Sequence, residues 1–176
     1  MNIDNQLWLF ANQYYRYPGV AQQLLALQNN HDLSVNLHIY VVWLVSIERK
    51  IVTLPSANCN VSAWQSEVTA PLRKIRQLVK QQKTANSSLE ATLTLCYQQL
   101  LDAELAAEKF ELGLLYHQHS EHSQGNAAGG NLQQLLDYNL EFYWRNNLPV
   151  AELSAVGKAA QESFKKIALK FLSDKT

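Results

Sequence analysis

One hydrophobic run constrains the fold of this chain more than any other feature. From Val35 to Ile47 almost every side chain is apolar, so a helix built from the run would be apolar nearly all round. The run includes Asn36 and His38, and it is shorter than the about 20 residues that cross a bilayer. A period-2 strand over 37–43 is the competing interpretation. Because helical patterns flank the run on both sides, we expect a buried central helix in an all-α fold.

Helical periodicity recurs along the rest of the chain. Apolar residues three and four positions apart predict further helices, with proline, asparagine and glycine between them. The predicted helices start after Asn2 or Asp4 and after Pro18, and then cover about 35–48, 62–83, 89–116, 132–144 and 150–172. Pro71 is expected to kink or restart the helix that contains it.

The length of the chain suits one domain. At 176 residues, the sequence predicts a single helical domain over 1–176, a bundle of six or seven helices. A segment rich in serine, asparagine and glycine at about 120–131 is expected to form a flexible surface loop. Too little chain follows this loop to build a second core.

Charge and cysteine content exclude several classes of protein. Fifteen basic and fifteen acidic side chains cancel, so no global field attracts nucleic acid or a membrane. Cys59 and Cys96 are too few for a disulfide framework or a zinc site. The first residues lack the basic and apolar regions of a signal peptide. We therefore expect a cytoplasmic protein that has no cofactor and binds neither nucleic acid nor a membrane.

The predicted helices over 62–83 and 89–116 carry opposite charges. Three basic residues lie on one side of the first helix, namely Arg73, Arg76 and Lys80. At about 100° per residue, three acidic residues of the second helix lie on the same face as its leucines. These are Glu104, Glu108 and Glu111. Since carboxylates in line with leucines are partly buried and need partners, we predict that the two charged faces meet.

Three interpretations of these charged faces remain open. In the first, the arginines and glutamates form an interhelical salt-bridge network without a ligand. In the second, part of the basic face of Arg73, Arg76 and Lys80 binds an anion, such as a phosphate, a carboxylate or an acidic segment of a partner. In the third, the clustered glutamates perform acid–base chemistry, because clustering raises one carboxyl pKa. No nucleophile or substrate pocket is identifiable for the third.

Aromatic residues are concentrated before residue 44, beside two polar residues of the central run. The set consists of Trp8, Tyr14, Tyr15, Asn36, His38 and Trp43. Buried tyrosine and tryptophan need hydrogen-bond partners for their polar tips, and the Asn36 and His38 side chains could supply them. The set therefore forms either a hydrogen-bonded core or a groove that binds a ligand or a partner.

A histidine-rich run follows the fifth predicted helix. His117, His119 and His122 lie close to Glu121, and zinc accepts such ligands. The run matches neither the Glu-x-x-His pattern of di-metal bundles nor the His-Glu-x-x-His pattern of zinc proteases. Histidines at the C-terminal end of a helix also complement its dipole. We therefore assign no metal site and keep these histidines as weak candidates.

Several short motifs resemble a small family of uncharacterised proteobacterial proteins. The opening motifs include Leu7-Trp8-x-Phe10, Tyr14-Tyr15, Pro18-Gly19-Val20, Leu27-Gln28, Asn36-Leu37 and Trp43-Leu44. The second block runs from Trp64 to Val68 and continues with Pro71-Leu72-Arg73, Arg76 and Lys80, and Glu104 and Glu108 are similar to the family's acidic helix. The resemblance covers about 5–115 and implies a helical cytoplasmic protein without an established activity, whose C-terminal helical tail diverges.

These observations do not identify a reaction. The sequence has no glycine-rich phosphate loop, catalytic triad motif or zinc-ligand spacing. We therefore predict a non-enzymatic interaction or regulatory module that binds a segment of a partner protein or assembles with further copies of itself. The alternative is a binder of, or an enzyme acting on, a small anionic ligand held by Arg73, Arg76 and Lys80.

Overall fold

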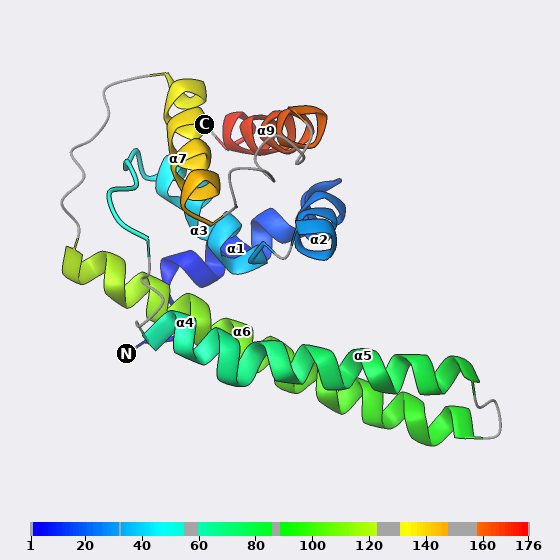
Figure 1. The fold of residues 1–176 in the computed structure, drawn as a ribbon. Helices are drawn as coiled ribbons and strands as arrows, with labels where there is room; N and C mark the ends of the chain where they lie inside the picture. Colours follow the sequence, from blue (N-terminus) through cyan, green and yellow to red (C-terminus); the bar gives the residue numbers. More distant parts are fainter. Residues whose placement is uncertain are drawn as a thin grey trace. The chain divides into compact units, whose positions relative to one another are not determined.

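The computed structural model describes residues 2–31, 33–54, 60–85, 89–122, 131–147 and 158–175. Their regular structure is helical without a strand, which confirms the all-α prediction (Figure 1). If α4, η1 and α5 are taken as one continuous helix, these residues form seven helices. The chain divides into two compact units, Met1–Ile3 with Pro55–Gln118 and Asp4–Leu54 with His119–Thr176. The division does not test the prediction of a single domain.

The unit that contains residues 60–118, here called the hairpin unit, is built from one long helix and its antiparallel neighbour. The first is made of α4 (Asn60–Trp64), a π-helical turn η1 (Gln65–Thr69) and α5 (Ala70–Ala85), and the second is α6 (Glu90–His122). Figure 1 shows α5 and α6 side by side along most of their length. Near the start of the first of these two helices, the indole of Trp64 donates a hydrogen bond of 3.0 Å to the carbonyl oxygen of Ala107 on α6.

The π-helical turn lies directly before Pro71. Proline has no backbone N–H, and in an α-helix its ring would collide with the carbonyl group four residues earlier. The turn Gln65–Thr69 widens the backbone at this point, and the N–H of Ala70 donates to the carbonyl oxygen of Gln65, five residues back. The predicted disturbance at Pro71 therefore takes the form of a π-helical turn inside a continuous helix.

The other unit, here called the core unit, is organised around the central helix. Its helices are α1 (Gln6–Tyr15), α2 (Val20–His31), α3 (Val35–Ser46), α7 (Leu132–Asn147) and α9 (Lys158–Ser173). Every residue from Asn36 to Val45 is buried, and α1, α2 and α7 all contact α3. The hydroxyl oxygen of Ser34 caps α3 by accepting a hydrogen bond of 3.3 Å from the N–H of Leu37. The hydrophobic run is therefore the buried helix that its composition predicts.

Helix boundaries differ from the predicted ones at a few positions. The predicted caps of the first helix, Asn2 and Asp4, are wrong, because the Asn5 side chain accepts the hydrogen bond of 2.9 Å from Trp8 N–H. Helix α6 continues to His122, through the first residues of the loop predicted at about 120–131, and residues 123–130 lie outside the described ones. The predicted start of the last helix, near 150, also lies outside them.

No helix in the described part of the chain combines the length and the apolar character that a bilayer span requires. The longest one, α6, carries charged side chains along its length. The most apolar one, α3, has only twelve residues. The described helices therefore contain no candidate for a membrane-spanning segment.

A buried asparagine on α7 forms hydrogen bonds to the segment that follows α3. The Asn139 side chain accepts a hydrogen bond of 2.9 Å from Ile51 N–H and donates one of 3.0 Å to the Arg49 carbonyl oxygen. Because Asn139→Ala would leave these buried backbone groups without their partner, we expect a loss of about 1–3 kcal/mol in the free energy of unfolding by urea. The exposed Asn146→Ala on the same helix is the control, and an equal loss in both variants would contradict this role.

Candidate functional site

Charged side chains join α5 to α6 in the middle of the hairpin unit. Glu104 is the centre of this network, and its side chain is only 4% exposed. Its carboxylate accepts a hydrogen bond of 2.9 Å from Nε of Arg73 and two hydrogen bonds from Arg76, through Nε and through Nη2 at 3.3 Å. Arg73 also donates from Nη2 to Oε1 of Glu108 at 2.7 Å. These contacts confirm the predicted interhelical salt bridges.

Two uncharged residues make further hydrogen bonds to charged side chains of this unit, one within the network at Arg76 and one beside it at Glu111. The phenol oxygen of Tyr97 accepts a hydrogen bond of 3.2 Å from Nη1 of Arg76, whose guanidinium also lies 5.6 Å from the centre of the Tyr97 ring. The hydroxyl group of Thr69 donates to Oε2 of Glu111 at 3.3 Å. Neither residue was predicted from the sequence, although Tyr97 lies seven residues before Glu104 and therefore on the same face of the helix.

The electrostatics of the network follow from partial burial. The hydrogen bonding that Arg76 donates to the Glu104 carboxylate is the main cause that raises the pKa of the Arg76 guanidinium. Burial raises the pKa of the Glu108 carboxyl, and the opposing effect of Arg73 does not fully cancel the increase. The N–H donors of both arginines thus point at carboxylates of the same unit. Lys80, on the same helix as the two arginines, has an exposed side chain.

The other side of α5 is exposed and partly apolar. No side chain from Ala70 to Lys83 is buried. Pro71, Ile75 and Leu78 recur at helical spacing on the side that points away from Arg73 and Arg76. Ile75 is 48% exposed and Leu78 is 52% exposed. We call Pro71, Ile75 and Leu78 the outer stripe.

The aromatic set is divided between buried and exposed positions. Within the core unit, Tyr14, Asn36, His38 and Trp43 are buried, whereas Tyr15 is exposed. Trp8, from the same helix as Tyr15, is partly exposed. Most of the set therefore lies in the hydrophobic core, where the buried Tyr14 hydroxyl has no hydrogen-bond partner among the described residues.

His38 is hydrogen-bonded at both ring nitrogens. Nδ1 lies 2.9 Å from the Ser34 carbonyl oxygen, and Nε2 lies 3.1 Å from Nε1 of Trp144 on α7. Because the carbonyl can only accept and the indole can only donate, the ring is neutral with its proton on Nδ1. Burial lowers its pKa to about 4. Trp144 was not foreseen from the sequence, since 106 positions separate it from His38.

The histidine-rich run is divided between exposed and packed positions. His117 is exposed, whereas the His119 ring packs edge-on against Trp43 with a centroid distance of 5.0 Å. Burial is the main cause that lowers the pKa of His119. The His122 side chain lies outside the described part. Among the side chains that are described, no three of histidine, cysteine, aspartate and glutamate gather as metal ligands would.

Comparison with known proteins identifies a family and no activity. A family model described as protein of unknown function, DUF2390, matches residues 6–115. The matched residues include α1 to α5 and most of α6, and therefore both the charged network and the aromatic set. No curated protein and no solved structure matches the chain. Because the match spans more than half of its length and agrees with the predicted resemblance, the chain belongs to the DUF2390 family of proteins of unknown function.

Proposed function

We propose that this protein is a non-enzymatic interaction module whose outer stripe on α5 binds an amphipathic helix of a partner protein. The observation that carries this proposal is the exposure of Ile75 (48%) and Leu78 (52%) on the side of α5 that points away from Arg73 and Arg76. These two apolar side chains gain little from packing within the described part of the chain, whereas the opposite side of α5 is joined to α6 by ion pairs. Burial of the outer stripe against a second helix would supply the missing apolar contact.

The charge of the partner helix follows from the charges that remain on α5. Glu104 and Glu108 accept hydrogen bonds from Arg73 and Arg76, so these arginines offer little charge to a partner. Lys74 is exposed and lies beside Ile75 and Leu78 on the helix surface. An apolar stripe with a lysine at its edge fits a helix that has leucines on one side and acidic residues next to them.

The anion-binding alternative is less favoured by this geometry. A phosphate or carboxylate at Arg73 and Arg76 would have to replace the carboxylates of Glu104 and Glu108, which are held on the same unit at fixed positions. The raised pKa of Glu108 could support acid–base chemistry, but Arg73, from which it accepts a hydrogen bond, is not a nucleophile. We place the module in the cytoplasm of a proteobacterium, as the sequence and its resemblance predict.

A synthetic peptide tests the proposal. The probe is a fluorescein-labelled helix of about three heptads with leucine at a and d and glutamate at e and g. A second peptide carries lysine in place of every glutamate. We expect saturable anisotropy changes with the acidic peptide and binding that is roughly tenfold weaker for the basic one. The double variant Ile75→Ser/Leu78→Ser should lose the binding.

The matched control is Leu95→Ser on α6, where a leucine that is also exposed (61%) lies outside the outer stripe. This variant should bind the acidic peptide as the parent protein does. Equal affinity for both peptides, or equal loss in the control, would show that the stripe and its charge do not select the partner. Analytical sedimentation would show whether the protein self-associates. If it does, and if Ile75→Ser/Leu78→Ser abolishes the self-association, then a second copy of the chain binds the outer stripe, and the proposal of a different partner protein is overturned.

A further inference from the structure

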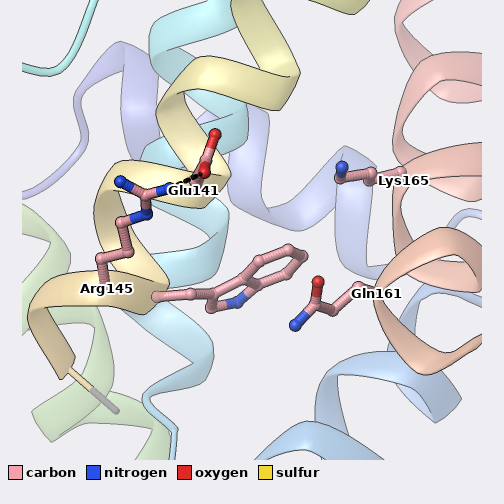
Figure 2. Close-up of a pocket in the computed structure, with 5 residues that line it drawn as sticks. Glu141, Arg145, Gln161 and Lys165 are labelled. Atoms are coloured by element: carbon pink, nitrogen blue, oxygen red, sulfur yellow. Dashed lines mark hydrogen bonds and ion pairs between the residues drawn. The ribbon is translucent and has the colours of Figure 1, made fainter. Parts of the chain in front are cut away.

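The pocket between α7 and α9 has its charges balanced by its own neighbours. Its volume is about 410 Å³, and its lining residues are Glu141, Trp144, Arg145, Gln161 and Lys165 (Figure 2). Arg145 pairs with Glu141, and Lys165 pairs with Asp137 and Glu162. The Trp144 side chain is only 3% exposed, so its indole presents almost no surface to a ligand. Lys175, which follows α9, has a different environment.

Two perpendicular aromatic rings form a corner in the core unit. Phe10 of α1 and Phe171 of α9 pack edge-to-face, with a centroid distance of 5.5 Å and an interplanar angle of 82°. The Nζ atom of Lys175 lies 5.1 Å from the centre of the Phe10 ring and 4.8 Å from that of Phe171. The face of an aromatic ring attracts a cation within about 6 Å. Two rings therefore hold the Lys175 ammonium group at once.

A hydrogen bond completes this recognition of the ammonium group. Nζ of Lys175 donates to Oε1 of Gln13, which lies one turn after Phe10 on α1. Partial burial lowers the pKa of Lys175, so the corner removes part of the water around the ammonium group. Cation–π attraction strengthens as the cation loses water. The corner thus offers a cation two ring faces and a neutral acceptor.

The segment that carries the lysine is fastened at a second point. The hydroxyl group of Tyr17 donates a hydrogen bond of 2.5 Å to Oδ2 of Asp174, and the Tyr17 ring packs edge-on against Phe171. We call Asp174 and Lys175 the strap. Both of its side chains are exposed, so water competes for their contacts. The strap is therefore the part of this arrangement that can leave while the two rings stay in place.

We propose that Phe10, Gln13 and Phe171 form a binding corner for an alkylammonium group and that Lys175 is its internal occupant. An external amine binds where the strap has left, so the strap is an autoinhibitory contact. The lysine side chain of a partner and a small free amine share this chemistry. The corner belongs to the core unit and has no residue in common with the outer stripe, so it does not rest on the proposed function.

Chemical complementation of Lys175→Ala in the full-length protein tests the corner. The variant removes a propylammonium group, and n-propylammonium is added back as the probe, followed by NMR of the labelled phenylalanine rings. We expect saturable shifts of the Phe10 and Phe171 signals, with 1-propanol binding roughly two- to fivefold more weakly because it lacks the charge. The parent protein should bind the probe roughly fivefold more weakly or worse, since its corner is vacant only when the strap is open.

Three results would overturn the proposal. Equal affinity for 1-propanol would mean that the corner recognises only apolar groups. The lack of saturation by n-propylammonium would mean that there is no site. Equal affinity in the parent protein would mean that Lys175 does not occupy the corner.

Two further variants locate the binding. Gln13→Ala, added to Lys175→Ala, removes the acceptor at an exposed position and should raise the dissociation constant of n-propylammonium by roughly threefold. Lys166→Ala removes an exposed lysine of the same helix and should bind the probe no better than the parent protein does. An unchanged dissociation constant with Gln13→Ala, or binding in Lys166→Ala as tight as in Lys175→Ala, would contradict the assignment.

A second probe, Nα-acetyl-lysine methylamide, distinguishes the two sources of the amine. Tighter binding of this probe than of n-propylammonium to Lys175→Ala supports the corner as a site for a lysine of a partner, and weaker binding supports it as a site for a small amine. None of these outcomes bears on the outer stripe.

Discussion

Replacing Glu104 with alanine is expected to lower the free energy of unfolding of the hairpin unit by about 3–5 kcal/mol. The variant leaves two guanidinium groups, those of Arg73 and Arg76, without their shared carboxylate. Both arginine side chains are only partly exposed, Arg73 by 20% and Arg76 by 17%, so water replaces the lost hydrogen bonds poorly. Hydrogen exchange of the α5 and α6 amides measures the effect where it occurs, since the local stability of this unit sets the exchange rates.

Asp102→Ala is the matched control for this experiment. Asp102 is an exposed acidic residue on the same helix and accepts a hydrogen bond of 3.0 Å from Gln98. We expect it to change the stability by less than about 1 kcal/mol. A loss of the same small size for Glu104→Ala would show that the arginines are adequately solvated, and that the network contributes little to the hairpin unit.

A second large effect is expected in acid and depends on His38. Burial lowers the pKa of this histidine from its ordinary value of 6.5 to about 4 in the folded protein. Protonation therefore favours the unfolded chain, and the neutral ring contributes its full stability only above pH 6.5. As the pH falls from 6.5 through 4, about 3 kcal/mol of the free energy of unfolding should be lost. Urea unfolding at a series of pH values measures this loss.

The variant His38→Gln isolates the titration of this one residue. Glutamine does not ionise, so the difference in unfolding free energy between parent and variant should shrink as the pH falls toward 4. His117→Gln, at an exposed position, should keep the pH dependence of the parent protein. Parallel curves for the parent and His38→Gln over this range would refute the assigned neutral state of the buried ring.

The charged network could be predicted because each of its two halves follows from the residue pattern of one helix. Glu104 and Glu108 share a face with leucines at 100° per residue, and a carboxylate on such a face requires a cationic partner. The preceding helix carries the opposite charge and therefore supplies that partner. The all-round apolar character of 35–47 predicted the buried central helix in the same way.

Other features depend on contacts that periodicity does not reveal. Asn2, Asp4 and Asn5 all carry side chains that can cap a helix, and their capping energies differ by too little to decide between them. The hydrogen bond between Trp144 and His38 joins segments that are far apart in sequence, and so do the two hydrogen bonds from Asn139 to the backbone of residues 49 and 51. The pocket between α7 and α9 depends on the packing of two such helices, and no local motif indicates it.

The central claim is that Arg76 and Glu104 interact with each other inside the hairpin unit and are not available to a ligand. A double-mutant cycle of Arg76→Ala and Glu104→Ala, with stability measured by amide exchange in α5 and α6, tests it most directly. We predict a coupling free energy of about 2 kcal/mol or more, so that the double variant is much less destabilised than the sum of the single variants. Single-variant effects that simply add would contradict the account.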